Sequence, residues 1–184
     1  RVKLGAIAGM INYNQRGNVL EHSMKLLGAR VFVHDPDCAE AFESIPESAL
    51  PEHVLDFAAL DAAAQGRSEA DPQVTATLPA STEAFYIFTS GTTGLPKASV
   101  MSHNRWLASL SGIGGLAVRL RASDTMYVPL PLYHNNALSV SLSSVLASGA
   151  CIAIGKHFSA SKFWDDVILN RATAFCYIGE LCRY

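Results

Sequence analysis

One short segment of the chain concentrates the residue types that bind anions. The run from Thr89 to Gly94 reads TSGTTG, so every side chain in it is a hydroxyl or a hydrogen atom, and Lys97 follows three positions later. Glycine lets a backbone approach a ligand with its N–H groups turned toward it, hydroxyls donate to phosphate oxygens or ligate Mg²⁺, and lysine adds a compact positive charge. Apolar runs at 85–89 and 98–101 place this loop between two strands. The segment therefore predicts a phosphate-binding loop.

Composition alone leaves other interpretations of this loop open. Ser, Thr and Gly are ordinary turn residues, so the segment can also be a plain hairpin loop. A Walker loop requires G-x-x-x-x-G-K-[ST], whereas here Leu-Pro follows Gly94 and Ala98 follows Lys97. A plain nucleotide-binding module with a P-loop fold would also begin a helix directly after the glycines, where this sequence has a strand-like run. The P-loop interpretation is the weaker one.

Strands and helices are expected to alternate along most of the chain, because short apolar runs predict strands and apolar spacings of three and four predict helices. The expected strands are 5–12, 30–34, 74–78, 85–89, 98–101, 125–128, 150–154 and 173–178, and the expected helices are 19–27 with Gly28 as C-cap, 54–64, 103–110, 136–147 and 159–170 with Ser159 as N-cap. This order predicts an α/β fold of layered parallel or mixed sheets flanked by helices, with 5–34 forming one β-α-β unit. The stretch 36–82, rich in Ala, Glu, Ser, Pro and Asp, is expected to be a surface connection.

Composition and charge exclude several classes of protein. The 184 residues are 49% hydrophobic and 16% charged, which is typical of a globular domain and not of a disordered or fibrous chain. Fourteen Lys and Arg against sixteen Asp and Glu, with no basic stripe, predict no nucleic-acid partner. Four cysteines without a C-x-x-C pair favour a reducing compartment. The uncharged window 125–155 is longer than the roughly 20 residues of a membrane span, but prolines and polar residues interrupt it, so we expect a strand, a helix and a strand there.

The order of residues in the loop resembles one superfamily. Residues 89–97, TSGTTGLPK, match the signature loop of the adenylate-forming enzymes, which include acyl-CoA synthetases, luciferases and peptide-synthetase adenylation domains. The segment PLPLYHNN at 129–136 resembles their second motif, and Asn12–Gly17 with Leu20, His22 and Ser23 resembles the early β-α-β unit of acyl-CoA synthetases. The sequences FSASKFWDD at 158–166 and YIGELCRY at 177–184 are similar to the fatty acid transport protein branch, the very-long-chain acyl-CoA synthetases.

This resemblance implies a reaction in two steps. ATP and a carboxylic acid give an acyl-adenylate and pyrophosphate, and the thiol of coenzyme A then displaces AMP. The residues implied to cradle the β- and γ-phosphates are Thr89, Ser90, Gly91, Thr92, Thr93, Gly94 and Lys97. A threonine hydroxyl, with Thr92 preferred over Thr93, is implied to lie near Mg²⁺, and Lys97 is implied to hold the departing pyrophosphate.

A second group of candidates concerns the acid substrate. His134 corresponds to the family's aromatic-His position beside the reacting carboxylate and the acyl tunnel, which makes it a candidate catalytic and substrate-binding residue; apart from the resemblance, it reads as a core histidine bonded to a backbone carbonyl. Tyr177, Ile178 and Gly179 end an expected strand, where an open α/β sheet presents its ligand crevice, so we expect them to line the acyl channel. The remaining large aromatic side chains are expected to pack in the core, namely Trp106, Tyr127, Phe163 and Trp164.

Three further patterns are not functional signals. The run Gly112–Ala117 fits G-x-G-x-x-A, but a helical pattern precedes it and no acidic residue lies about twenty positions on, so we expect a loop. Asp165 and Asp166 are adjacent on a helix, so their side chains diverge and are expected to form a solvated face. His103 and His157 have no metal-ligand spacing with the cysteines, and no zinc site is expected.

The resemblance also implies what the chain is part of. We expect residues 1–184 to belong to the large N-terminal AMP-binding domain of a longer enzyme, because the acidic Mg²⁺ motif, the ribose-binding aspartate and the C-terminal domain with its catalytic lysine have no counterpart here. The chain alone is expected to be inactive. The parent is expected to activate long or very long fatty acids with ATP and coenzyme A, in the cytoplasm or attached to the inner face of a membrane. A ligase for another carboxylic acid and a non-catalytic lipid-handling relic remain alternatives.

Overall fold

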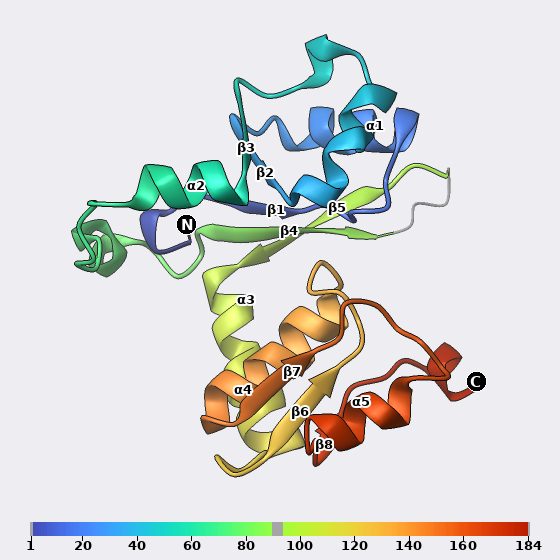
Figure 1. Ribbon diagram of the computed structural model, residues 1–184. Helices are drawn as coiled ribbons and strands as arrows, with labels where there is room; N and C mark the ends of the chain where they lie inside the picture. Colours follow the sequence, from blue (N-terminus) through green and yellow to red (C-terminus); the bar gives the residue numbers. More distant parts are fainter. Residues whose placement is uncertain (1, 90–93, 184) are drawn as a thin grey trace. The chain divides into compact units, whose positions relative to one another are not determined.

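The computed structural model describes residues 2–89 and 94–183, and the chain divides into two compact units (Figure 1). The first unit contains residues 1–79 and 83–100, and the second contains residues 80–82 and 101–184. Helices and mainly parallel strands make up both units, so the predicted α/β class is confirmed.

A three-stranded sheet carries the predicted phosphate loop in the first unit. Its strands are β1 (Ala8–Met10), β4 (Glu83–Thr89) and β5 (Lys97–Ser102), in the order β1-β4-β5. Strand β1 is parallel to β4, with Gly9 opposite Tyr86. Strand β5 runs back along β4 (Figure 1), so the loop connects two neighbouring strands, as its flanking apolar runs predict.

A second, two-stranded sheet of the first unit pairs β2 (Val31–His34) with β3 (His53–Asp56) in parallel. Helix α1 (Gly17–Leu27) connects β1 to β2 and ends at a left-handed Gly28 as predicted. The interpretation of 5–34 as one β-α-β unit is nevertheless wrong, because β1 and β2 belong to different sheets. Strand β1 finds its partner far along the chain, and local patterns carry no information about such pairing.

The stretch 36–82 contributes more than a surface connection. It contains strand β3, the 3₁₀ helices η2 (Pro36–Ser44), η3 (Glu47–Ala49) and η4 (Gln73–Thr77), and helix α2 (Phe57–Ala64). Ala41 and Ile45 of this stretch are buried in a core cluster with two residues of α1. The helix expected at 54–64 begins only after Asp56, whose carboxylate accepts a hydrogen bond from the backbone N–H of Ala59. The strand expected at 74–78 is wrong, because η4 occupies that position.

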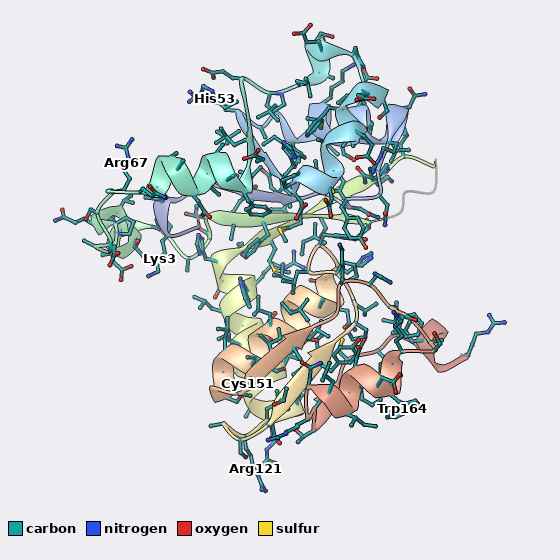
Figure 2. All side chains as sticks on the ribbon, in the orientation of Figure 1. Lys3, His53, Arg67, Arg121, Cys151 and Trp164 are labelled. Atoms are coloured by element: carbon teal, nitrogen blue, oxygen red, sulfur yellow. The ribbon has the colours of Figure 1, made fainter. Side chains whose placement is uncertain are left out.

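The second unit is built on a parallel sheet of β7 (Cys151–Ile154), β6 (Thr125–Val128) and β8 (Ala174–Phe175), in the order β7-β6-β8. The central strand β6 is the most deeply buried, and Val128 is completely inaccessible. Cys151 begins β7 (Figure 2). The window 125–155 is therefore a strand, a helical segment and a strand, as expected. Within the described ranges, no helix is both long enough and apolar enough to span a membrane.

Helices of the second unit differ from the prediction at two places. They are α3 (His103–Ala108), the π-helices η5 (Ser109–Val118) and η6 (Asn136–Leu142), α4 (Ser143–Ser148), α5 (Phe163–Leu169) and the 3₁₀ helix η7 (Gly179–Arg183). The run Gly112–Ala117, expected as a loop, lies inside η5, because the helical pattern that precedes it continues. Helix α5 starts at Phe163 and not after Ser159, since Ser159 and Lys162 form a separate turn with a backbone hydrogen bond of 3.2 Å.

Close packing between η5 and α4 depends on small residues. A Cβ atom on Gly114 would lie 2.9 Å from both the carbonyl oxygen of Ser143 and the Cα of Ser144. Ser143 and Ser144 are fully buried, and their hydroxyls donate to backbone carbonyls one turn earlier, in η6, each at 2.5 Å. The Ser143 hydroxyl also lies 3.4 Å from the carbonyl oxygen of Ser109 on η5. Because backbone carbonyls satisfy these small buried side chains, the two helices can meet backbone to backbone.

This contact gives a first prediction. Gly114→Ala must push apart backbone atoms that cannot rotate away, so we expect a loss of about 2 kcal/mol in the free energy of unfolding. The matched control is Gly112→Ala in the same helix, where the added methyl group meets nothing within 4 Å; we expect it to be neutral or to stabilise by about 0.5 kcal/mol. Urea unfolding of both variants measures the difference, and equal stabilities would contradict the packing argument.

Candidate functional site

The two ends of the predicted phosphate loop are held together in the first unit. Strand β4 ends at Thr89 and β5 begins at Lys97, and the Thr89 hydroxyl donates a long hydrogen bond of 3.4 Å to the Lys97 carbonyl oxygen. Gly94 has a φ of 83°, a left-handed conformation that favours glycine, and open space surrounds the position where a Cβ would stand. Four of the predicted site residues lie outside the described residues, namely Ser90, Gly91, Thr92 and Thr93.

The described part of the loop suits an anionic ligand. Lys97 is exposed, and its ammonium group forms no ion pair with any carboxylate in the described ranges. At Gly94, a Cβ atom would meet no atom of the described residues within 4 Å. An uncompensated cation next to an accessible backbone is the arrangement that phosphate-binding turns use. Within the same ranges no group of three or more His, Cys, Asp or Glu side chains is placed to hold a metal ion.

One contact to the loop comes from a residue for which the sequence analysis predicted no role in the site. The imidazole of His22, on α1, lies with Nε2 3.0 Å from the carbonyl oxygen of Pro96, the residue before Lys97. The only sequence signal was its position in the segment that resembles acyl-CoA synthetases. Spacing along the chain could not reveal the contact, because 74 residues separate the two partners.

His134 stands in the second unit just before η6. Its backbone N–H donates to the carbonyl of Pro131 at 3.0 Å, and its own carbonyl accepts from Leu138 at 3.0 Å, so the residue starts the helix. Its ring packs against that of Tyr133 at 4.5 Å between centroids. The residue as a whole is exposed, which contradicts the core-histidine interpretation, yet partial desolvation of the imidazole lowers its pKa below the ordinary 6.5. His134 is therefore neutral at pH 7.

The strand-end candidates lie beside an aromatic cavity in the second unit. Tyr177 follows β8 and lines a cavity of about 350 Å³, and Ile178 and Gly179 come directly after it at the start of η7. Side chains from three segments form the lining: Phe158, Ala160, Phe163, Trp164, Phe175, Tyr177 and Leu181. The expectation that Trp164 packs in the core is wrong, because it is 63% exposed on α5 (Figure 2). Tyr127, by contrast, is buried as expected.

A partly buried hydrogen bond connects the sheet to the helix that lines this cavity. The hydroxyl of Tyr127, on β6, donates to the Asp166 carboxylate of α5 at 2.8 Å. Desolvation, helped by the hydrogen bond to Asp166, raises the pKa of Tyr127 to about 12. The expectation that both acidic residues form a solvated face is thus wrong for Asp166, which is half-buried, and only Asp165 is exposed.

Comparison with known proteins identifies the family. The family model described as AMP-binding enzyme matches residues 2–184. The chain belongs to the AMP-binding enzyme family. It is 54% identical over 185 residues to the medium/long-chain-fatty-acid–CoA ligase FadD6 of Mycobacterium tuberculosis, and 38% identical over 205 residues to the long-chain fatty acid transport protein 2 of Rattus norvegicus. Each alignment covers 100% of this chain and 31% of the relative, so the chain spans about a third of their length.

Solved structures with the AMP-binding enzyme fold superpose on this chain. The inhibitor-bound N-terminal domain of FACL13 from Mycobacterium tuberculosis superposes with a TM-score of 0.80 at 22% identity, over 94% of this chain and 44% of that one. A fatty acyl CoA synthetase of the same organism gives a TM-score of 0.77 at 22% identity, over 94% of this chain and 34% of that one. The predicted superfamily and the fold are confirmed.

The contact between Tyr127 and Asp166 yields a second prediction for this AMP-binding unit. Tyr127→Phe leaves a half-buried carboxylate without its donor, so we expect a loss of about 1.5 kcal/mol in the free energy of unfolding. Asp165→Asn, one position from Asp166 and exposed, is the control and should change stability by less than about 0.5 kcal/mol. Chemical unfolding at pH 7 measures both, and a Tyr127→Phe variant as stable as the control would refute the structural role.

Proposed function

We propose that the chain is part of the large N-terminal domain of a fatty acyl-CoA ligase, the C-terminal domain lying outside it. In this proposal the whole protein joins a long or very long fatty acid to coenzyme A with ATP, through an acyl-adenylate. The loop between β4 and β5 carries the proposal, because it combines a left-handed Gly94 with a Lys97 that pairs with no carboxylate of the described residues, at a strand end. The name of the relative at 54% identity, a medium/long-chain-fatty-acid–CoA ligase, supports the choice of acid.

The chemistry of the first step explains why such a loop is needed. A carboxylate oxygen is a weak nucleophile, and it must attack the α-phosphorus of a polyanion while the bond to the pyrophosphate oxygen breaks. Neutralising charge and holding the groups in line contribute more than acid or base catalysis. Lys97 would stabilise the charge that develops on the leaving pyrophosphate, and the Thr89–Gly94 segment would bind the β- and γ-phosphates. The Thr92 hydroxyl is our candidate for the Mg²⁺ site, where the ion would neutralise phosphate charge.

The acid would be held by the second unit. A neutral His134 can donate a hydrogen bond to the substrate carboxylate without adding a fixed charge. The aromatic cavity next to Tyr177 is apolar enough to accept a hydrocarbon chain, and Tyr177, Ile178 and Gly179 are proposed to border its path. Such a ligase would work in the cytoplasm, with peripheral attachment to the inner face of a membrane as the way to reach long-chain acids.

A non-catalytic lipid-handling protein that keeps the loop as a relic is the competing function, and Lys97 distinguishes the two. In the full-length protein we expect Lys97→Ala to slow acyl-adenylate formation about a hundredfold, because a cation at the leaving group is lost. Thr92→Val should also slow this step. Lys25→Ala is the control, since Lys25 pairs with Glu21 one turn away on the surface of α1. Pyrophosphate release measures the rate, and unchanged rates in both loop variants would favour the relic.

The lowered pKa of His134 gives a prediction about pH. A neutral imidazole is required in the proposal, so activity should stay level until the pH falls below 6.5 and should then decline as His134 takes up a proton. The same shift destabilises the folded protein in acid, because the unfolded chain is protonated first as the pH falls through 6.5. His134→Asn should remove the acid limb from the profile of kcat/KM for the fatty acid, whereas His157→Asn, an exposed control, should retain it. An acid limb that survives His134→Asn would rule out this role.

A further inference from the structure

The segment before α1 forms a fixed turn. The side-chain oxygen of Asn12 accepts a hydrogen bond from the backbone N–H of Asn14 at 2.9 Å, and its carbonyl accepts from Gln15 at 3.0 Å. Arg16 reaches the carbonyl oxygens of Tyr13 and Gln15 and the carboxylate of Glu40. Gly17 then begins α1 with a φ of 53°, and its N–H donates to the Ser44 hydroxyl at 2.8 Å. Hydrogen bonds within the preceding turn, and with Glu40 and Ser44 farther along the chain, therefore fix where α1 begins.

Helix α1 is also anchored along its length. Leu20 and Met24 are buried in the cluster that contains Ala41 and Ile45. At the end of the helix, Leu27 packs over Gly9 of β1, since a Cβ on Gly9 would come within 2.7 Å of both terminal methyl groups of Leu27. Strand β1 is parallel to β4, the strand that leads into the loop. The helix is thus fixed in relation to the same sheet that carries the phosphate loop.

From this anchored helix His22 extends to the far end of the loop. A carbonyl oxygen only accepts hydrogen bonds, so the 3.0 Å contact with Pro96 requires the hydrogen on Nε2 of His22. Pro96 has no N–H of its own and a fixed φ, and the next carbonyl, that of Lys97, accepts from Thr89. Two consecutive peptide groups are therefore held by side chains, one from α1 and one from β4. Because Lys97 lies between these two peptide groups, they fix the direction in which its side chain leaves the backbone.

We propose that His22 is a positioning residue of the phosphate loop, which holds the Pro96–Lys97 peptide so that the Lys97 ammonium meets the nucleotide phosphates. This inference rests on the proposed function. Its consequence is that the early segment Asn12–Ser23 serves ATP binding through its hold on the loop.

A purely architectural role for His22 predicts a different result, and kinetics separate the two. Loss of folded protein lowers the concentration of active enzyme and leaves each KM unchanged, whereas a displaced loop weakens one substrate selectively. In the full-length protein, we expect His22→Leu to raise the KM for ATP about five- to tenfold, the factor that one partly buried hydrogen bond supplies, and to leave the KM for the fatty acid unchanged. His53→Leu on β3, an exposed histidine away from the loop (Figure 2), is the control.

Two amide variants keep the inference testable if the leucine variant does not fold. The amide of glutamine can occupy the place of Nε2 and donate to the Pro96 carbonyl, whereas the shorter asparagine places its amide near Nδ1 and cannot reach. His22→Gln should therefore keep the wild-type KM for ATP, and His22→Asn should show the raised one. Equal values for these two variants, or a KM for the fatty acid that rises as much as that for ATP, would overturn the proposal.

Equilibrium binding of ATP with Mg²⁺ to the same full-length variants distinguishes failure of this inference from failure of the proposed function. A wild-type protein that binds ATP but forms no acyl-adenylate from any fatty acid would refute the proposed function, and the weaker ATP binding expected for His22→Leu and His22→Asn would still support the positioning role. Wild-type activity together with unchanged ATP affinity in those variants would refute the positioning role alone. A wild-type protein that binds no ATP would overturn both.

Discussion

The pairing of β4 with β5 is the constraint on which the candidate site depends. A run of hydroxyl residues and glycines has no preferred conformation of its own, because glycine loses more backbone entropy than any other residue when it is fixed. The two strands fix the ends of the loop at Thr89 and Lys97, and the contacts at Pro96 and Lys97 fix its second end further. Backbone that is held before a ligand binds loses less entropy on binding, so the fixed peptide groups of Pro96 and Lys97 leave more of the binding energy for the phosphates.

Local sequence patterns were enough to predict the loop and its flanking strands. The pairing between distant segments could not be predicted from them. The residues of the loop and its apolar flanks suffice for the strand–turn–strand arrangement, and helix 19–27 with its Gly28 cap follows from spacing and composition. The assignment of β1 and β2 to different sheets does not follow, because sheet order depends on contacts between segments about 75 residues apart. Strand β3 was also not predicted, because its pattern His53–Asp56 is short and lies in a stretch rich in Pro and Ala.

The roles of individual side chains show the same difference between what neighbouring residues determine and what distant segments determine. Two adjacent aspartates on a helix diverge, as the sequence analysis assumed, but divergence sends one of them toward the sheet, where Tyr127 binds it. Trp164 was expected inside because large aromatic residues usually are, yet its helix α5 turns that side outward. A residue type predicts only the average burial of a side chain. The segments that pack against a particular side chain decide how buried that side chain is. For this reason the loop residues could be proposed from sequence, whereas the support from His22 required the structure.

The contact at His22 changes how the motifs of this chain relate to each other. Motif resemblance presents Asn12–Ser23 and the phosphate loop as separate signatures of one family, and a sequence gives no reason why they should occur together. The structure supplies one, because α1 and β4 both belong to the first unit and hold successive carbonyls of the same short segment. A substitution in the turn at Asn12 or Gly17 would shift the start of α1, and His22 would then miss a carbonyl that tolerates only tenths of an ångström. The early segment is thus a condition for the geometry of the loop, and its effect on ATP would appear without any contact to the nucleotide.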